Sequence, residues 1–380
     1  MTNTQYQQCS KTVMDNIADP YITFDKDGIC NYYHEYYIKE KKHVKKGQEG
    51  IDFYNKKIDE IKKSGKNNKY DCILGLSGGV DSSYLAYLAK KDGLNPLVVH
   101  FDNGWNSELA VKNIESIVSN LGFDLYTYVI NWEEFKDIQL AYIKASVIDI
   151  EAITDHAIIA TLYKLAAKHK IKYFLSGFNI VTEGILPKAW VFNKQDAENI
   201  KSIHKTYGTI PLKTFPFLDA FKKRYYSVAL NIESVPLLNY ISYNKADVKQ
   251  ILINELNWKD YGGKHYESVF TRFYQGFILP EKFKVDKRKA HLSTLICSGQ
   301  ISKEKAVQEL KEPICDAEQL SIDKDYVLKK LGFNDQEFDA IMKMPTRSHL
   351  EFKTESKSYF DKYPIIKPLK GLYNLIKSKR

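Results

Sequence analysis

Between about residue 70 and residue 190, short apolar runs alternate with longer stretches whose apolar positions recur with the helical period. The short runs have the length of buried strands, and two of the three longer stretches end at a glycine, a common helix stop. The pattern predicts strands within 71–77, 95–104, 123–131 and 171–177, and helices within 81–93, 107–122 and 154–170, the last with Thr154 as its N-cap. Strands and helices that alternate in this way indicate crossover connections. We therefore expect an α/β fold with a doubly wound, mostly parallel sheet covered on both faces.

The segments before and after this region have different patterns of apolar residues. Residues 1–60 form a small head in which ITFDKDGIC alternates around a hairpin turn at Asp27-Gly28. Residues 191–380 are mainly helical, with helix candidates within 244–256, 302–311 and 334–344. We therefore predict three parts: the head at 1–60, an α/β domain at 61–190 and a helical region at 191–380. The last residues place Leu369, Leu372, Tyr373 and Ile376 on one helical face, which we expect to dock on the protein body.

Composition narrows the class of protein. The hydrophobic fraction of 44% and charged fraction of 27% are ordinary for a globular protein, and five cysteines in 380 residues do not form a disulfide scaffold. The N-terminus lacks the apolar core of a secretory signal and no apolar run is long enough to span a bilayer, so we expect a cytoplasmic protein without stable membrane insertion. The net charge of +9 permits an anionic partner, but the lysines are spread widely and we expect no nucleic-acid binding.

The segment LGLSGGVDSSYLA carries the chemistry. It leads from a predicted strand into a predicted helix, where backbone N–H groups point at an anion. Gly78 and Gly79 allow close approach of the backbone, Ser77, Ser82 and Ser83 add hydroxyl groups, and Asp81 in the first helical turn holds the loop or a metal ion. The Gly-Lys-Ser/Thr ending of a Walker A loop is absent, so the lysine that would reach a γ-phosphate is missing.

This loop is similar to the pyrophosphate loop of the PP-loop ATP pyrophosphatase superfamily, which has the adenine nucleotide alpha hydrolase-like fold. The superfamily includes asparagine, GMP and NAD synthetases and tRNA-thiolating enzymes. The resemblance implies ATP with Mg²⁺ as cofactors, cleavage between the α- and β-phosphates, and ATP at the carboxyl ends of the strands. It also implies that Asp102, after the second strand, lies beside the nucleotide, although a strand-end turn is the alternative. In LSGFNIVTEG, it implies that Gly177 and Glu183 face ATP.

Three further stretches resemble one branch of the superfamily, the N-acetyl sugar amidotransferases of bacterial surface-polysaccharide pathways (lipopolysaccharide O-antigen or nonulosonic acid). They begin FDNGWNSELA, TDHAIIATLY and WKDYGGKHYE. The resemblance implies that the acetamido group of a nucleotide-activated N-acetyl sugar is adenylated and then attacked by ammonia to give an acetamidino group. The cysteines lie in no glutaminase-like context, so we expect ammonia from a separate glutaminase partner. A tRNA-thiolating enzyme and a non-enzymatic nucleotide-binding subunit remain as alternatives.

The basic segment DKRKAH, residues 286–291, lies within the last of these stretches. By analogy with asparagine synthetases, Lys287 or Arg288 would neutralise phosphate charge in the transition state, with Asp81 as the third catalytic candidate. Lys264 and Glu267 are second-tier candidates. For each of these residues a surface role is the alternative.

Relatives in this branch commonly open with two CxxC pairs that would form a zinc site. Here only the first cysteine of each pair is present, as Cys9 and Cys30, and Thr12 and Tyr33 stand in the second positions. His34 is displaced by one residue. Because a structural zinc site normally takes four good ligands, we expect no zinc.

Overall fold

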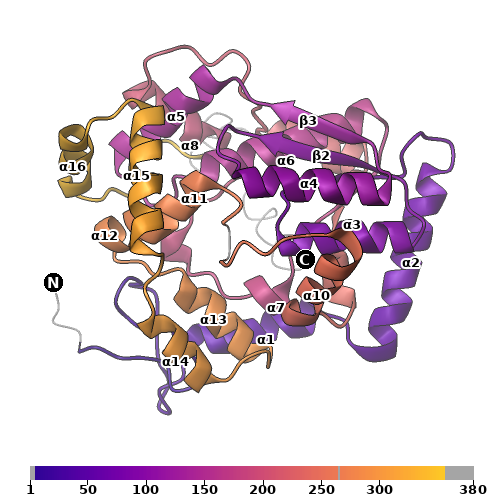
Figure 1. The fold of residues 1–380 in the computed structure, drawn as a ribbon, viewed down its shortest axis with the longest axis horizontal. Coiled ribbons are helices and arrows are strands. Elements are labelled where there is room, and N and C mark those ends of the chain that lie inside the picture. Colours follow the sequence, from indigo (N-terminus) through magenta and orange to yellow (C-terminus); the bar gives the residue numbers. More distant parts are fainter. Residues whose placement is uncertain (1–4, 264–265, 356–380) are drawn as a thin grey trace, which may run out of the picture.

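The computed structural model describes residues 5–263 and 266–355, and its centre is a sheet of five parallel strands (Figure 1). The strands are β1 (Cys72–Gly75), β2 (Pro96–Asp102), β3 (Leu125–Val129), β4 (Tyr173–Leu175) and β5 (Glu233–Val235). Their order across the sheet is β3-β2-β1-β4-β5, and every neighbouring pair is parallel. The four predicted strands are all present, and the α/β fold with a doubly wound parallel sheet is confirmed.

Sixteen helices surround this sheet in the described part of the chain. They are α1 (Asn31–His43), α2 (Gly47–Gly65), α3 (Val80–Lys91), α4 (Glu108–Leu121), α5 (Trp132–Ala145), α6 (Ala152–Lys168), α7 (Ile180–Glu183), α8 (Ala197–Tyr207), α9 (Ala220–Arg224), α10 (Lys245–Leu256), α11 (Val269–Phe273), α12 (Leu279–Phe283), α13 (Arg288–Cys297), α14 (Lys303–Lys311), α15 (Ala317–Leu331) and α16 (Asp335–Lys343). All six helices predicted from apolar periodicity are among them.

Side chains alternate between the two faces of the sheet, as the pleat requires. In β1, Leu74 packs with the helices α2, α3, α4 and α10, whereas Ile73 packs with α6 on the other face. Figure 1 shows α3 and α4 over the sheet in this view. Because both faces are covered, the strands are apolar along nearly their whole length, which is why they read as continuous apolar runs.

The side of the sheet on which successive strands are added changes between β1 and β4, although all five strands run in the same direction. From β1 the order runs through β2 to β3 on one side, and through β4 to β5 on the other. The loops that follow β1 and β4 therefore diverge at the same edge, and ligands of open α/β sheets bind in the crevice at such a point. The predicted phosphate loop follows β1, and LSGFNIVTEG follows β4.

Segments outside residues 61–190 also contribute to this fold. Strand β5 adds an edge to the sheet from the region predicted as mainly helical. The head contacts α13, because the backbone N–H of Val13 donates to Ser293 Oγ at 3.3 Å. No helix among residues 5–263 and 266–355 is long and apolar enough to cross a membrane.

One local prediction needs correction. Helix α6 begins at Ala152 with Glu151 at its N-cap, so Thr154 lies in the first turn and is not the cap. The predicted hairpin in the head is present and short, with an antiparallel bridge between Phe24 and Cys30 and with Gly28 at a φ of 70° in its turn. The predicted C-terminal helix with Leu369 lies outside the described residues.

Candidate active site

The loop after β1 is fixed from outside by the C-terminal region. Gly78 has a φ of 82°, which favours glycine, and a Cβ there would lie 2.8 Å from the Tyr261 hydroxyl. The carbonyl oxygen of Gly78 accepts hydrogen bonds from Trp258 Nε1 at 2.7 Å and from the Tyr261 hydroxyl at 3.1 Å. The backbone is therefore held with the geometry that only the glycine allows.

The serines shape the loop from within. Ser83 Oγ donates to the carbonyl oxygen of Gly79 at 2.7 Å, and Ser82 Oγ lies 3.1 Å from Ser77 Oγ. Helix α3 has no side-chain cap at its N-cap, Gly79. The N–H groups of its first turn therefore receive no hydrogen bond from the N-cap residue, and such a helix N-terminus can bind a phosphate group. The loop fits the pyrophosphate part of ATP.

Asp81 joins this loop to two other segments. Its Oδ1 accepts hydrogen bonds from the Tyr243 hydroxyl and from Asn179 Nδ2, the latter at 3.3 Å. Burial, followed by the charge of Asp81, raises the pKa of Tyr243 well above its usual range, so the phenol stays a donor. Asp81 is thereby held at the amino end of α3, where a carboxylate is favourable.

The described residues contain no group of three or more His, Cys, Asp or Glu side chains arranged to hold a metal ion. A Mg²⁺ ion bound with ATP takes most of its ligands from phosphate oxygens and water. Asp81 and Glu267 fit as protein contributors, because both lie at the loop. A Cβ on Gly79 would meet Glu267 Oε1 at 3.3 Å.

The loop after β4 lies directly against the start of α3. A Cβ on Gly177 would lie 3.3 Å from the backbone nitrogen of Ser82 and 3.5 Å from Asp81 Cβ. Asn179 then caps α7, since its Oδ1 accepts from Thr182 N at 2.9 Å, and α7 ends at Glu183. The structure thus brings Gly177 to the phosphate loop, and Glu183 is near enough to Tyr243 to affect its pKa.

Asp102 ends β2 at the same edge of the sheet. Its Oδ1 accepts from Gly104 N at 2.8 Å and from Asn106 Nδ2 at 3.1 Å, which are the contacts of a strand-end turn. Asn106 Nδ2 also donates to His100 Nε2 at 3.2 Å, and His100 Nδ1 donates to the carbonyl oxygen of Leu76 at 3.2 Å. Burial lowers the pKa of His100, in keeping with this neutral form. The nucleotide-side role of Asp102 stays a prediction.

The adjacent residues Lys287 and Arg288 have different surroundings. Arg288 makes an ion pair with Asp286 at 2.8 Å, and its Nη1 donates to the carbonyl oxygen of Glu312 at 2.8 Å. These contacts engage the Arg288 guanidinium within the protein, and its catalytic role stays a prediction. Lys287 instead has its ammonium 6.0 Å from the centre of the Tyr274 ring. Burial lowers its pKa, and among the described residues no carboxylate lies within ion-pair distance of it.

Acidic residues near Lys287 escaped the sequence analysis. Asp149 and Glu151 precede α6, and Asp155 lies in its first turn. Asp149 is 2% exposed, and burial raises its pKa. Asp155 makes an ion pair with Lys194. The sequence signal was available in SVIDIEAITD, where acidic residues interrupt an apolar run at a predicted helix start.

The second-tier candidates are partly described. Glu267 stands beside the phosphate loop because the segment 267–269 pairs with 105–107: Ser107 N donates to the carbonyl oxygen of Glu267 at 2.9 Å, and Val269 N to that of Trp105 at 2.8 Å. Lys264 lies outside the described residues.

Cys9 and Cys30, the two cysteines that remain of the CxxC pairs, are also buried. Cys30 N donates to Cys9 Sγ at 3.2 Å, and Thr12 Oγ1 lies 3.9 Å from Cys30 Sγ. The hydrogen bond with Cys30 lowers the pKa of Cys9 to about 4. His34 is turned toward Asp25, with Nε2 and Oδ2 2.9 Å apart. The absence of zinc stays a prediction.

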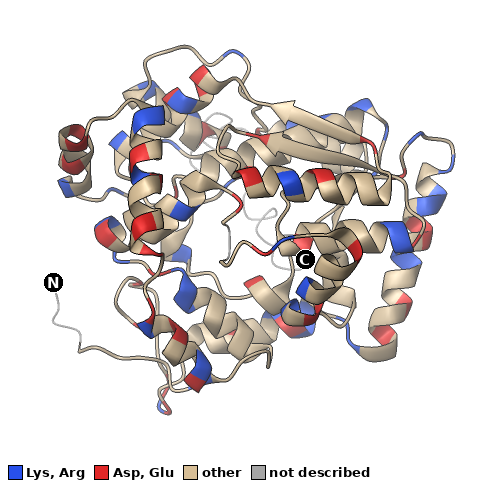
Figure 2. Ribbon diagram, in the orientation of Figure 1, with Lys and Arg blue, Asp and Glu red and all other residues tan. Residues whose placement is uncertain are grey.

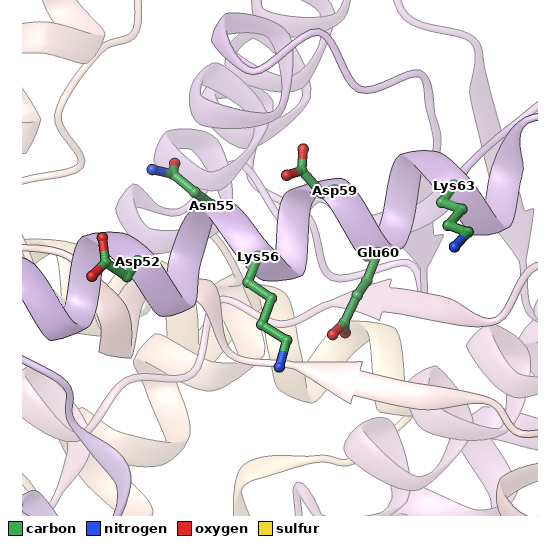
Figure 3. A pocket seen from close by; sticks show the side chains of 6 residues that line it. All are labelled: Asp52, Asn55, Lys56, Asp59, Glu60 and Lys63. Carbon is green, nitrogen blue, oxygen red and sulfur yellow. The ribbon is translucent and has the colours of Figure 1, made fainter.

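Among the described residues, the hollow along α2 and the charge distribution in the view of Figure 2 do not point to another site. The hollow along α2 is lined by side chains from one solvated helix face, Asp52, Asn55, Lys56, Asp59, Glu60 and Lys63 (Figure 3). Acidic and basic residues are interspersed over the helices in the view of Figure 2.

Comparison with known proteins divides the chain into two matched parts. Residues 71–178 match the asparagine synthase family, and residues 267–367 match the family described as LPS biosynthesis protein WbpG-like, C-terminal domain. The first match spans β1 to the loop after β4. The second contains Glu267, Lys287 and Arg288.

Two of the individual proteins that this chain is similar to are described as a synthase or a synthetase. GMP synthase of Thermosipho africanus is 31% identical over 197 residues, which is 50% of this chain and 36% of that protein. The chain therefore spans about a third of the length of this relative. An uncharacterised protein of Methanocaldococcus jannaschii is 26% identical over 68% of this chain and 79% of its own length. The solved NH3-dependent NAD synthetase of Campylobacter jejuni covers 78% of this chain and 98% of its own, at 14% identity and a TM-score of 0.30.

The two family matches cover the phosphate loop and the C-terminal segment that the sequence resemblance rested on. The asparagine synthase match supports an ATP-using synthetase of the PP-loop type, and the WbpG-like match supports the branch that the sequence resembles. The chain thus combines an asparagine synthase domain with a WbpG-like C-terminal domain of LPS biosynthesis proteins.

Proposed function

We propose that this protein is an ATP-dependent amidotransferase that converts the acetamido group of a nucleotide-activated N-acetyl sugar into an acetamidino group in lipopolysaccharide biosynthesis. The observation that carries the proposal is the loop from Ser77 to Ser83, which has an uncapped helix start and no lysine for a γ-phosphate. Such a loop suits a departing pyrophosphate. The WbpG-like domain supports the sugar as acceptor.

The chemistry balances without a redox step. The amide oxygen attacks the α-phosphorus of ATP, the bond to the β-phosphate oxygen breaks, and pyrophosphate leaves. Ammonia then adds to the activated carbon, the carbon–oxygen bond breaks, and AMP leaves with the former amide oxygen. One proton passes from the added nitrogen to a base or to pyrophosphate, and the product is an amidinium ion.

Different residues would stabilise the two leaving groups, pyrophosphate and AMP. Backbone N–H groups of the loop and α3 would hold pyrophosphate, with Asp81 positioned by Tyr243 and Asn179. Lys287 would neutralise charge on the α-phosphate, where a preorganised cation stabilises the transition state.

Ammonia would come from a separate glutaminase partner. All five cysteines of the chain are buried. A glutaminase of the cysteine type needs a reachable thiolate, and burial of the thiols speaks equally against a tRNA-thiolating enzyme, which needs a reactive cysteine.

The test is product analysis with ATP, an ammonium salt and a panel of nucleotide-linked acetamido sugars. We expect AMP and pyrophosphate, together with a sugar in which NH replaces one oxygen. Asp81→Asn should abolish both products. Formation of ADP, or no turnover with any acetamido sugar, would contradict the proposal.

A further inference from the structure

The helix that leads into β5 is apolar on its outer side as well as on its inner side. Helix α9 continues without a break into the π-helical turn η2 (Tyr225–Ala229). On the inner side, the Tyr226 ring stacks on the Tyr163 ring of α6 with centroids 5.7 Å apart, and Leu230 packs into the same apolar cluster. These inner contacts already provide the burial that attaches a crossover helix to its sheet.

Three large side chains project from the outer side. Phe221 is 74% exposed, Tyr225 is 51% exposed and Val228 is 67% exposed. Spacings of four and three residues place them in one row along the helix, so they form an apolar stripe. Single exposed apolar residues are ordinary, but a helix that is apolar on all sides is normally buried on all sides. The apolar stripe therefore indicates a contact surface.

Basic residues border the apolar stripe on both flanks. Lys222 and Arg224 are exposed, and a helical rotation of about 100° per residue places them on opposite sides of the row that begins at Phe221. Residues 220–232 contain one further basic residue, Lys223, and no acidic residue. The surface that covers the apolar stripe must therefore be anionic as well as apolar.

The C-terminal segment of the chain begins nearby but has the wrong charge to cover the apolar stripe. Lys223 Nζ donates to Gln195 Oε1, and Glu355 N, at the end of the described chain, donates to the adjacent Asp196 at 3.0 Å. Residues 356–380 contain seven basic residues and one acidic residue, so they carry +6 of the net charge of +9. Their charge repels Lys222 and Arg224 and shares the preference for an anionic surface.

The surface of a bilayer fits these features better than a folded partner does. A stable protein interface takes about 20–30 residues on each side, whereas the apolar stripe is one short row. A membrane surface needs no matching shape, because apolar side chains enter the boundary between headgroups and acyl chains while flanking cations meet lipid phosphate groups. Nucleic acid would also attract the cations, but Val228 offers it no stacking surface.

We propose that the apolar stripe binds the protein reversibly to the surface of an anionic bilayer, with Lys222 and Arg224 beside lipid phosphate groups. The stripe lies on the α6 side of the sheet, whereas the phosphate loop leads into α3 on the other side. The contact therefore leaves the phosphate loop uncovered. This surface goes beyond the proposed function and does not depend on it.

Co-sedimentation of the full chain with vesicles tests the contact. We expect binding to vesicles of phosphatidylglycerol and phosphatidylcholine, at least about ten-fold weaker binding to phosphatidylcholine alone, and weaker binding as salt is raised. The triple variant Phe221→Ser, Tyr225→Ser and Val228→Ser should bind anionic vesicles at least about ten-fold more weakly. Lys222→Gln combined with Arg224→Gln should also weaken this binding at least about ten-fold. Since these side chains are exposed, the melting temperature should stay nearly unchanged.

The matched control replaces three comparably exposed apolar residues on other helices, Ile38 on α1, Ile51 on α2 and Ile322 on α15. The combined variant Ile38→Ser, Ile51→Ser and Ile322→Ser should bind anionic vesicles as the unsubstituted protein does. An equal loss of binding in this control would overturn the inference. Unchanged binding in the stripe variant would overturn it too, because residues 356–380 would then account for the attraction.

A tryptophan probe locates the contact. The emission of Phe221→Trp should shift to shorter wavelength when anionic vesicles are added, because the indole leaves water, whereas that of Ile322→Trp should not. Binding of single-stranded RNA but not of anionic vesicles would overturn the inference in favour of a nucleic-acid surface. None of these measurements needs turnover, so a protein that releases no AMP with any acetamido sugar refutes the proposed function and leaves the membrane contact standing.

Discussion

Trp258 donates its indole N–H to the carbonyl oxygen of Gly78 over 2.7 Å, across 180 residues of sequence. Trp258 is 1% exposed, and its ring packs in the core beneath α3 and α10. The phosphate loop is therefore held by the C-terminal region as well as by its own strand and helix. A loop fixed in this way needs less reorganisation when pyrophosphate charge develops.

Replacing Trp258 by Phe should loosen the loop while keeping an aromatic ring in the core. The Gly78 carbonyl would lose its shorter hydrogen bond, and we expect the free energy of unfolding to fall by about 1–3 kcal/mol. We also expect a rise in the KM for ATP in an assay of AMP formation. Tyr261→Phe removes the longer bond to the same oxygen and should have the smaller effect. An unchanged KM in both variants would show that the contact is only structural.

Gly177→Ala should weaken the site through close packing alone. The new Cβ would lie 3.3 Å from Ser82 N, so the loop after β4 or the first turn of α3 must move. We expect pyrophosphate–ATP exchange to fall by about ten-fold, since small displacements of positioned groups are costly for rate. Gly75→Ala is the control, because its Cβ would make ordinary contact with Leu162 at 3.8 Å. If both variants exchange equally well, the packing at Gly177 does not position the loop.

The buried ammonium group of Lys287 predicts that kcat depends on pH. Burial lowers its pKa, so it loses its proton at a lower pH than an exposed lysine does. If the ammonium neutralises phosphate charge, kcat falls as pH rises through this lowered pKa. Lys287→Arg keeps its charge at high pH and should move the fall in kcat to higher pH, whereas Lys287→Met should lose about a hundred-fold or more in kcat.

The control for Lys287 is Lys289→Met, which removes a lysine paired with Asp15 of the head. Its pH profile of kcat should match that of the unsubstituted protein. An alkaline fall that persists unchanged in Lys287→Arg would assign the titration to another group.

The zinc content of the purified protein tests the prediction that the head binds no zinc. Cys9 and Cys30 are buried together, but Thr12 and Tyr33 stand in the second position of each pair. Two cysteines with no further ligand set among the described residues do not make the four-coordinate site that structural zinc prefers. Elemental analysis of protein purified without chelators should find well under one equivalent of zinc, and dialysis against EDTA should leave the melting temperature unchanged. One equivalent of bound zinc would refute this expectation.

The sheet and the phosphate loop could be predicted because their causes are local. Buried parallel strands read as apolar runs, and the loop combines Gly78 with a strand and a helix start. Strand β5 was missed because its three residues carry little periodic signal and pair only through tertiary structure. Trp258 and Tyr261 stood in a stretch used for resemblance, yet nothing local shows that they reach Gly78.

The basic segment, residues 286–291, shows more clearly what could not be predicted from the sequence. Lys287 and Arg288 are adjacent and similar in type, so spacing alone did not separate them. Their contacts do: Arg288 is held by Asp286 and by carbonyl oxygens near the end of α14, whereas the ammonium of Lys287 lies 6.0 Å from the centre of the Tyr274 ring. Which of two neighbouring charges is buried depends on how α13 packs, and that is decided by residues far away in the chain.

The buried histidines predict a loss of stability in acid. His156 uses both ring nitrogens: Nδ1 donates to the carbonyl oxygen of Lys194 at 2.9 Å, and Nε2 accepts from Leu218 N at 3.0 Å. Burial lowers its pKa to about 4, against an ordinary value near 6.5. Between these two pH values the unfolded chain binds a proton that the folded protein excludes, so stability falls as pH decreases. The difference corresponds to about 3 kcal/mol by pH 4.

Urea unfolding at a series of pH values measures this effect. The free energy of unfolding should decline from pH 6.5 downward, and His349, whose pKa burial lowers to about 3, adds to the decline. In His156→Gln the decline should be shallower by roughly the contribution of one histidine, since glutamine provides a donor and an acceptor but does not titrate. His34→Gln is the control, because its ring is largely exposed beside Asp25. The same slope in His156→Gln and in the unsubstituted protein would show that His156 does not cause the acid sensitivity.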